Sequence, residues 1–545
     1  MSKDIALIID GQNVKGKEGE TILSVAKREG IDIPTLCHHP DLPSKANCRL
    51  CITEIAERKG FFTSCSTPIE PGMIVSTNSP ALRAARKTIL ELLLGEHEKE
   101  CPTCLKRGDC LILEYAKTYD ALPDRFINRK SHYRPISFGP AIVYDPKKCI
   151  DCRNCVEVCQ SQTINHLAIK ERGHLFQVVP DDKNPCIYCG QCVSHCPAEA
   201  IEIKSDLERF EAVLLDKSKT VVVQIAPAVR VTIGEEFGFA PGKNVLSSLV
   251  GSLRGIGVKH IFDVSVGADF TTVEEVDELL DRLRSGKLLP MFTACCPAWV
   301  RYAELYHKSL LPNLTMTRSP HMILGGLIKS FWAKNQDIDP ENIVVVSVMP
   351  CTSKKYEITR PEQKLDEGWP VDLVVTTKEL SAFIKSKNID LKTCKKSEAD
   401  DPLGLPTEAG VIYGASGGVM ESALRSAYRK VTTKKLPLIK YLSHPSSLGI
   451  KIANIPLGSH SLKVAVASGI ANAKIILGEL DKSPHRYDYV EVMACPGGCI
   501  GGGGQPAGSA SIRKLRSEGL KKAGRGKQRE AEESPVVSEV YKTFL

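Results

Sequence analysis

The stretch VEVMACPGGCIGGGGQP, residues 490–506, carries two cysteines four positions apart, followed by four consecutive glycines. Cys495 and Cys499 are too close along the chain to form an unstrained structural disulfide. Four glycines in a row weaken any regular element, because glycine loses the most conformational freedom on folding. The stretch therefore predicts two thiolates held close together, next to backbone that another group can approach.

The overall composition is that of a multidomain globular chain. Its 545 residues, 42% hydrophobic and 25% charged, predict three or four domains. No run of eighteen apolar residues exists, which disfavours a membrane span, and the N-terminus lacks an apolar signal core, so a cytoplasmic location is expected. The formal charge of +8 is dense only over residues 512–530, which favours a solvated face over nucleic-acid binding.

The twenty-one cysteines are the anomaly in this composition. Disulfides are disfavoured in a reducing compartment, so clustered cysteines there indicate metal binding or catalysis. Fifteen of the cysteines fall into three groups before residue 200, and six follow later in the chain.

The first group lies in a segment that reads TLCHHPDLPSKANCRLCITEI and ends at a later TSC. The residues before it predict strand, turn, strand and helix, the order of a small β-grasp domain. A close cysteine pair with one distant ligand on each side suits a 2Fe–2S centre, with a longer first gap than in plant-type ferredoxins; zinc is the alternative. The predicted ligands are Cys37, Cys48, Cys51 and Cys65.

The second group lies in GEHEKECPTCLKRGDC. One histidine with three cysteines fits zinc as well as iron, but the position between two iron–sulfur patterns favours a 4Fe–4S cluster with one imidazole ligand. His38, His39 and His132 lack such a frame, so we expect them at the surface. The predicted ligands are His97, Cys101, Cys104 and Cys110.

The third group is the least ambiguous, because CIDCRNCVEVC and CIYCGQCVSHCP both follow the C-x2-C-x2-C-x3-C pattern of two-cluster bacterial ferredoxins. The fourth cysteine of each run binds the other cluster. With this pair the chain before residue 210 is predicted to carry four clusters, three 4Fe–4S and one 2Fe–2S. The two ligand sets are Cys149, Cys152, Cys155 with Cys196, and Cys186, Cys189, Cys192 with Cys159.

From about residue 210 short apolar runs alternate with helical stretches, which predicts an α/β fold with mostly parallel sheets. Three of the runs end on cysteine, and sites in such sheets form at the carboxyl ends of the strands. Cys394 lies in a polar stretch and is expected to be a bystander. The predicted strands fall within residues 220–227, 290–297, 342–351, 371–377 and 487–495.

Three motifs, TACCPAW (293–299), MPCTSKKYE (349–357) and EVMACPGGCIGGGGQP (491–506), resemble the signatures of iron-iron (FeFe) hydrogenases. The resemblance covers nearly the whole chain and implies the large monomeric type with four accessory clusters. It implies four domains of α+β and α/β type, with a short C-terminal tail. These are a β-grasp 2Fe–2S domain (1–80), a small 4Fe–4S domain with one histidine and three cysteine ligands (81–125), a ferredoxin-like domain with two 4Fe–4S clusters (126–209) and a catalytic α/β domain (210–545).

The resemblance also assigns the remaining cysteines. It implies an H-cluster, a 4Fe–4S unit joined to a diiron unit with CO, cyanide and a bridging dithiolate, with Cys499 bridging the two units. Lys354 matches the lysine that meets a cyanide ligand, and Met349 and Met493 match apolar neighbours of the diiron unit. The implied ligands are Cys296, Cys351, Cys495 and Cys499.

Proton delivery is implied to begin at Cys295, the thiol not spent on iron. We predict a helix over 268–286 with a threonine-acidic start and a glycine after its end, which places Glu275, Glu278 and Arg282 on one face. These residues match the proton relay of the family. Carboxylates suit such a relay because they can accept and release protons. Thr315 stands where the family usually completes the relay with serine.

Three further departures, Ala294, Ala298 and His321, make the motifs resemble a less-studied subgroup and leave rate, catalytic bias and oxygen tolerance open. The implied reaction is reversible proton reduction and dihydrogen oxidation, after maturation proteins insert the diiron unit. No dinucleotide-binding fingerprint is found, so a ferredoxin or flavodoxin is the expected electron partner. An electron-transfer subunit, a hydrogen sensor and an assembly-type relative remain the alternatives.

Overall fold

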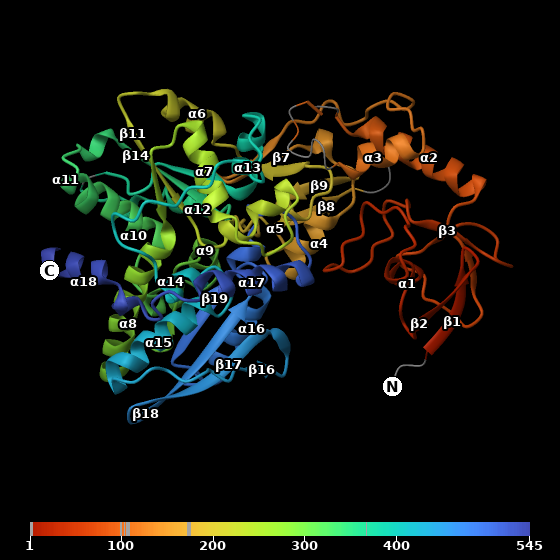
Figure 1. Ribbon diagram of the computed structural model, residues 1–545. Helices are drawn as coiled ribbons and strands as arrows, with labels where there is room; N and C mark the ends of the chain where they lie inside the picture. Colours follow the sequence, from red (N-terminus) through yellow and green to blue (C-terminus); the bar gives the residue numbers. More distant parts are fainter. Residues whose placement is uncertain are drawn as a thin grey trace.

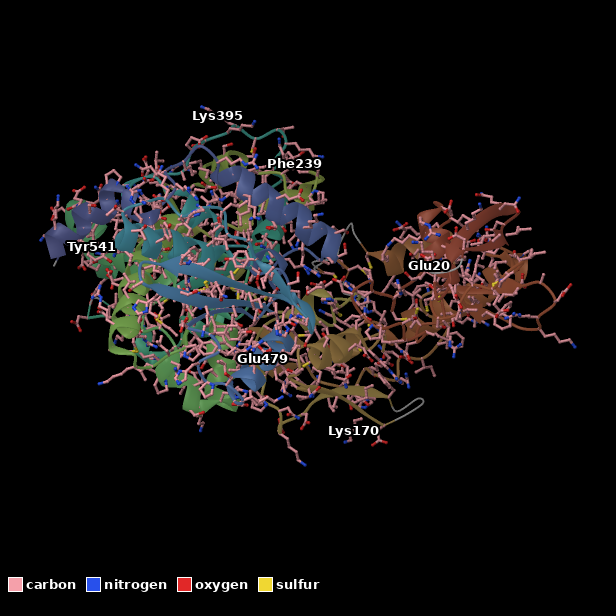
Figure 2. All side chains as sticks on the ribbon, turned by 90° about the horizontal axis from the view of Figure 1, so that it is seen from below. Glu20, Lys170, Phe239, Lys395, Glu479 and Tyr541 are labelled. Atoms are coloured by element: carbon pink, nitrogen blue, oxygen red, sulfur yellow. The ribbon has the colours of Figure 1, made fainter. Side chains whose placement is uncertain are left out.

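The computed structural model describes residues 4–98, 101–102, 104, 110–171, 176–366 and 368–544. Figure 1 shows the N-terminal residues at one end of the molecule and the C-terminal part forming the largest body. Figure 2 shows the same two parts with their side chains: Glu20 lies in the small N-terminal part, and Glu479 and Tyr541 lie in the large C-terminal part. Among these residues no helix combines the length and apolar character that crossing a membrane requires.

The N-terminal part consists of a five-stranded sheet with the order β2-β1-β5-β3-β4 and one helix, in agreement with the predicted β-grasp. Side chains of β1 alternate between exposed and buried, so one face covers the helix. Thr21 and Ser24 cap that helix reciprocally. The elements are β1 (Asp4–Ile9), β2 (Gln12–Lys17), α1 (Ile22–Arg28), β3 (Ile52–Ile55), β4 (Phe62–Thr63) and β5 (Ile74–Ser76).

The middle part contains the two ferredoxin-type cysteine runs in matching conformations. A left-handed residue, Arg153 in one run and Gly190 in the other, precedes helices α4 and α5 at the same position after the second cysteine. The elements are α2 (Pro80–Glu96), α3 (Leu111–Thr118), β6 (Ile136–Phe138), β7 (Ile142–Tyr144), α4 (Asn154–Ser161), β8 (Leu167–Lys170), β9 (Gln177–Pro180), α5 (Gln191–Ser194) and β10 (Ile201–Ile203).

The C-terminal part is built on two sheets. The first, ordered β12-β11-β14-β15, is parallel throughout, as predicted. The second, ordered β13-β19-β18-β17-β16, is mixed, because the antiparallel hairpin β17–β18 extends it. The strands are β11 (Thr220–Ile225), β12 (His260–Asp263), β13 (Met291–Phe292), β14 (Ile343–Met349), β15 (Leu373–Thr376), β16 (Leu442–His444), β17 (Ser447–Leu457), β18 (His460–Ser468) and β19 (Tyr489–Met493).

Helices surround these sheets (Figure 1), and the buried apolar side chains of this part form several clusters. The helices are α6 (Leu207–Leu215), α7 (Leu246–Ile256), α8 (Val264–Ser285), α9 (Pro297–Tyr306), α10 (Pro320–Leu327), α11 (Ala333–Asn335), α12 (Lys354–Glu357), α13 (Thr377–Ser386), α14 (Glu408–Ile412), α15 (Gly418–Thr432), α16 (Ile470–Leu480), α17 (Ala510–Gly524) and α18 (Pro535–Phe544).

Helix α8 begins four residues earlier than the sequence predicts. Asp263, the last residue of β12, is its N-cap and accepts a hydrogen bond from the amide of Ser265. Thr271 and Thr272 lie inside the helix, where their hydroxyls donate to the carbonyls of Gly267 and Ala268. The predicted end is correct, since Gly286 follows the helix in a left-handed conformation.

Most of the basic segment 512–530 forms α17. The expected solvated face is correct for Lys514, Lys521, Lys522 and Arg525, which are exposed, and wrong for Arg516. Arg516 is fully buried and donates to Glu235 through two bonds of 2.7 and 2.6 Å. It also donates to the carbonyls of Ile500 and Pro506, at 2.9 and 3.0 Å. A guanidinium with this many partners can be buried, so α17 packs against the glycine-rich segment.

Replacement of Arg516 by alanine should destabilise the C-terminal part, because it leaves the Glu235 carboxylate largely buried without its cation. Breaking a buried pair in this way costs about 3–5 kcal/mol. The measurement is the urea midpoint of the purified protein, with Lys514→Ala, an exposed residue of the same helix, as the matched control. Equal midpoints for the two variants would contradict a supporting role for Arg516.

Candidate active site

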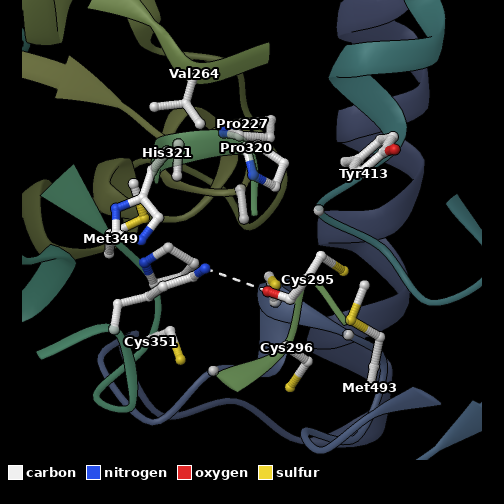
Figure 3. Close-up of a pocket in the computed structure, with 18 of the residues that line it drawn as sticks. Pro227, Val264, Cys295, Cys296, Pro320, His321, Met349, Cys351, Tyr413 and Met493 are labelled. Carbon is white, nitrogen blue, oxygen red and sulfur yellow. Dashed lines mark hydrogen bonds between the residues drawn. The ribbon is translucent and has the colours of Figure 1, made fainter. Parts of the chain in front are cut away.

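Three strand ends deliver five cysteines to one buried pocket. Cys295 and Cys296 follow β13, Cys351 follows β14, and Cys495 and Cys499 follow β19. Figure 3 shows Cys295, Cys296 and Cys351 on one side of the pocket, with Pro227, Val264 and Pro320 on the other. The structure therefore brings together all five of the cysteines that the sequence pointed to this site, and Met349 and Met493 line the same pocket.

The chemistry of the four thiols assigned to iron fits a metal cluster. Burial raises the pKa of each of them above the ordinary value, and that of Cys351 to about 12. A thiolate at such a position lacks compensating charge, and a bound metal supplies it and deprotonates the sulfur. The four thiols are Cys296, Cys351, Cys495 and Cys499.

The glycines after Cys495 allow close approach of backbone, as the sequence predicts. Gly498 has φ +89°, and a Cβ atom there would lie 2.5 Å from the amide nitrogen of Ser416. A Cβ on Gly503 would lie 2.5 Å from the Cα of Gly190, which belongs to the second ferredoxin run. Any side chain at these positions would push apart the pocket or the contact with the ferredoxin segment.

Lys354 points its ammonium group into the pocket. The Nζ atom donates to the carbonyl of Cys295 at 3.2 Å (Figure 3), to Ser319 Oγ at 2.8 Å and to Glu357 Oε2 at 2.7 Å. Burial alone would lower the pKa of this lysine, but the Glu357 carboxylate outweighs it and raises the pKa. The lysine is therefore a fixed positive charge at the wall of the pocket.

His321 holds Glu357 from the other side. Its Nε2 lies 2.6 Å from Glu357 Oε2, and its Nδ1 lies 3.0 Å from Ser347 Oγ. Burial and Lys354 lower the pKa of His321 to about 4, so the neutral imidazole donates to Glu357 from Nε2. Gln224 donates to Ser347 at 2.6 Å and completes the chain. Sequence reasoning assigned no role to Glu357, Ser319, Ser347 or Gln224; the i+3 spacing from Lys354 was the available signal for Glu357.

The predicted relay residues lie behind the pocket wall, and only Cys295 lines the pocket itself. Glu278 accepts from Thr315 Oγ1 and from Arg282, both at 2.5 Å. Glu275 accepts from the hydroxyl of Tyr489 at 2.8 Å. The structure thus brings Glu278, Arg282 and Thr315 into direct contact, with Glu275 one helical turn away on the same face of α8.

Exposure rises along this series. Glu275 is 1% exposed, whereas the side chain of Glu278 is 20% exposed. Burial raises the pKa of Glu275 to about 8, and the nearby Glu278 adds to the effect. Glu275 is therefore protonated at neutral pH and can donate or accept a proton close to that range. Tyr489 and Tyr413, buried neighbours of the series, were not identified from the sequence.

The two ferredoxin-type cysteine sets come together as predicted, because the fourth cysteine of each run joins the first three of the other run. Each set lines its own small cavity in the middle part of the chain. One cavity is lined by Cys159, Cys186, Cys189 and Cys192, and the other by Cys149, Cys152, Cys155 and Cys196.

The cysteines of the N-terminal group are all buried, and the amide of Cys48 donates to Cys37 Sγ at 3.4 Å. In the second group His97 Nδ1 lies 2.7 Å from the carbonyl of Lys148, which leaves its Nε2 for a metal. The other members of these groups are Cys51 and Cys65, which are buried, and Cys101, Cys104 and Cys110, which are half-buried.

Our expectation that three histidines lie at the surface is correct for His132 and wrong for the other two. His38 and His39 are half-buried, because the loop after Cys37 packs against the segment of His195. The rings of His39 and His195 lie 4.3 Å apart.

The pocket directly adjoins the second ferredoxin set. Thr352 Oγ1 donates to the carbonyl of Tyr188 at 2.7 Å, and Gln191 Nε2 donates to the carbonyl of Gly501 at 3.0 Å. Farther along, Cys37 shares one apolar cluster with Cys152 and the neighbouring Cys196. A series of cysteine sets that ends at a cysteine-lined pocket is the arrangement expected of an iron–sulfur oxidoreductase.

Four family models match consecutive parts of the chain. "Iron only hydrogenase large subunit, C-terminal domain" matches residues 219–503. The earlier parts match "2Fe-2S iron-sulfur cluster binding domain" (2–80), "NADH-ubiquinone oxidoreductase-G iron-sulfur binding region" (86–121) and "4Fe-4S dicluster domain" (148–200). The chain therefore belongs to the iron-only (FeFe) hydrogenase family, as a hydrogenase oxidoreductase of hydrogen metabolism with accessory iron–sulfur domains. The expected multidomain fold is confirmed.

Similar proteins agree with this assignment. The NADP-reducing hydrogenase subunit HndD of Solidesulfovibrio fructosivorans is 38% identical over 99% of this chain and 96% of its own length. Iron hydrogenase 1 of Clostridium pasteurianum is 38% identical over 92% of this chain and 88% of its own. A solved variant of the apo FeFe-hydrogenase HydA1 from Chlamydomonas reinhardtii is 36% identical, with a TM-score of 0.57 over 63% of this chain and 95% of that one.

Replacement of Glu275 by glutamine should change how stability depends on pH. With a folded-state pKa of about 8 and an unfolded value of about 4.3, the native protein holds the extra proton between these values. Wild-type stability therefore falls as pH rises toward 8, by up to about 1.4 kcal/mol per pH unit from this group. Glutamine removes that contribution.

The measurement is the difference in urea midpoint between Glu275→Gln and wild type at pH 6 and pH 9, with exposed Glu274→Gln as the control. Relative to wild type, the urea midpoint of the Glu275 variant should be higher at pH 9 than at pH 6, whereas that of the control should not change. A difference that stays the same at both pH values would show that Glu275 is not protonated in the native state near neutrality.

Proposed function

We propose that this hydrogenase catalyses the reversible reduction of protons to dihydrogen, with electrons passing through four accessory clusters. The observation that carries the proposal is the set of thiols from three separate strand ends on one pocket, beside a fixed lysine. Four of these thiols match the ligand positions of the three family motifs. A plain electron-transfer subunit would have no use for such a pocket.

In this proposal Cys296, Cys351, Cys495 and Cys499 would hold the H-cluster, with Cys499 as the thiolate that would serve both of its units. When bound, the H-cluster supplies the iron at which dihydrogen is formed or split. Met349 and Met493 give the pocket an apolar wall that excludes water. The ammonium group of Lys354 would stabilise the anionic cyanide ligands of the cluster, and Glu357 and Ser319 hold that group in position.

The proton path that we propose runs along α8. Cys295 is the group of this path that faces the pocket, and it carries its proton because burial raises the pKa of its thiol well above the usual value. Glu275 exchanges protons behind it. Glu278, which is partly exposed, is held by Arg282 and Thr315 and connects the interior to solvent. The threonine hydroxyl keeps the hydrogen bond that a serine would make.

The electron path uses the four predicted domains, 1–80, 81–125, 126–209 and 210–545. We propose one 2Fe–2S and three 4Fe–4S accessory clusters on the ligand sets named above. The proton/dihydrogen couple lies near −0.4 V at neutral pH, from about 59 mV per pH unit, and plant-type 2Fe–2S centres lie near −400 mV. Such a path carries electrons either way. The cysteine content favours a reducing, cytoplasmic location.

Replacement of Cys295 by alanine tests the reaction and the proton path together. Anaerobically matured wild-type protein should show infrared bands of CO and cyanide on iron and should evolve dihydrogen. The variant should keep the bands and lose at least about 99% of the turnover, because an interrupted proton path removes a step that general acid–base groups speed up by about 10²–10⁴. Cys394→Ala, which removes a thiol outside the pocket, is the control.

Absence of the diatomic bands in matured wild-type protein would overturn the hydrogenase assignment of the pocket. Normal turnover in Cys295→Ala, with bands present, would overturn only the proton path.

The electron partner that we propose is a soluble ferredoxin or flavodoxin. The name of the HndD relative points instead to NADP, and this is the second candidate. The chain has no G-x-G-x-x-G fingerprint after a strand, so NADP would have to be reached through another subunit. Under dihydrogen the isolated protein should reduce added ferredoxin and should leave NADP⁺ unchanged. Reduction of an artificial one-electron dye checks that the protein oxidises dihydrogen. Reduction of NADP⁺ by the isolated chain would contradict the proposal that ferredoxin or flavodoxin is the direct partner.

A further inference from the structure

Two histidines and one aspartate meet where the N-terminal part contacts the ferredoxin part. His39 and Asp41 lie in the loop that follows Cys37, and His195 lies just after α5. One ligand atom of each residue lies within 4.8 Å of the other two. The imidazole rings are 4.3 Å apart and tilted by 45°. None of the three residues belongs to the predicted ligand sets of the clusters.

The hydrogen bonds of His195 are those of a metal ligand. Its Nδ1 lies 2.8 Å from the carbonyl of Gln191 and 3.0 Å from Ser194 Oγ. Donation from Nδ1 to the carbonyl fixes the tautomer and leaves a lone pair on Nε2. Metal-binding histidines almost always donate their other ring nitrogen in this way, which orients the ring and raises its basicity.

His39 and Asp41 supply the other two donors. The amide of Asp41 donates to His39 Nδ1 at 3.2 Å, so this nitrogen is the unprotonated one, and a metal ion bound there would replace the amide as its partner. Asp41 is anchored to the start of α17, where Oδ2 accepts from Arg513 at 2.8 Å and Oδ1 faces the amide of Ala510 at 3.4 Å. Arg513 also donates to the carbonyl of Gly508 at 2.7 Å, so its position does not depend on Asp41 alone.

We propose that His39, Asp41 and His195 bind one divalent metal ion of the zinc type, with water completing the coordination. Two imidazole nitrogens and one carboxylate oxygen are a donor set that zinc prefers, at distances of about 2.0–2.2 Å. Ligands at those distances lie about 3.3 Å apart in a tetrahedron. The ligand atoms, now within 4.8 Å of one another, therefore need to close by at most about 1.5 Å, and the Asp41 carboxylate would exchange one of its two contacts with α17 for the ion.

The site would tie together three segments that are far apart in the sequence. The metal would bind the loop next to Cys37 and the residue next to Cys196, and Asp41 would link it to α17 of the C-terminal part. It would fix the N-terminal cluster segment against the ferredoxin segment, where Cys37 and Cys196 already share an apolar cluster. This role is structural and goes beyond the proposed reaction.

Zinc binding by the iron-loaded, full-length protein tests the proposal. After removal of loose metal with a chelator, anaerobic equilibrium dialysis against Zn²⁺ and elemental analysis give the zinc and iron content per chain. Wild type should bind one tight equivalent of zinc without loss of iron. His39→Ala and His195→Ala should each weaken that binding at least about tenfold, whereas His485→Ala, at an exposed histidine elsewhere, should not.

Arg513 provides a test in the opposite direction. Arg513→Gln removes a cation that competes for the Asp41 carboxylate but leaves all three ligands, so zinc should bind more tightly than in wild type. This variant decides the matter if a histidine variant fails to load iron. Wild type without a tight zinc equivalent, or zinc binding that is unchanged in all three variants, would overturn the proposal. Loss of the zinc equivalent in Cys394→Ala would overturn the proposal as well, because this result would show that the ion is bound by the Cys394 thiol.

Discussion

The arrangement of this molecule depends on keeping several sulfur atoms away from water at one point. Thiolates in a low-dielectric interior are costly unless positive charge meets them. The protein places the thiols at the carboxyl ends of strands from both sheets, adds the ammonium of Lys354 and leaves the remaining charge compensation to metal. The short loops after β13, β14 and β19 meet at this point. Met349 belongs to one buried apolar cluster, and Cys296 and Met493 belong to another.

The same constraint explains the glycine run. The loop after Cys495 must pass the pocket on one side and touch the ferredoxin segment on the other. At Gly503 the approach to Gly190 leaves no room for a Cβ atom on either residue. Bonds from Thr352 to Tyr188 and from Gln191 to Gly501 hold the two surfaces together. At this contact the backbone of the pocket loop lies directly against the backbone of the second ferredoxin run.

Much of this could be predicted from the sequence, and the exceptions have a common cause. Cysteine spacing is a local signal, because the ligands of one cluster must reach it from a short loop, so the ferredoxin sets were recognisable. Strand ends were recognisable from apolar runs. Arg516 was not, because a basic residue is buried only when a distant partner, here Glu235, compensates it. The start of α8 depends in the same way on Asp263, the end of a strand that pattern alone did not reveal. Two of the polar partners of Lys354, Ser319 and the carbonyl of Cys295, likewise come from segments distant in the sequence.

The histidine at position 321 shows how a departure from the family motif can fit the same pocket. A neutral imidazole can accept at Nδ1 and donate at Nε2, and both bonds are made here, to Ser347 and to Glu357. The carboxylate of Glu357 thereby has two donors and stays ionised, with a pKa that burial raises but Lys354 and His321 together lower to about 2. An ionised Glu357 keeps the ammonium of Lys354 charged and fixed in direction. His321, which lines the pocket itself, therefore also acts on Lys354 electrostatically through Glu357, two hydrogen bonds away.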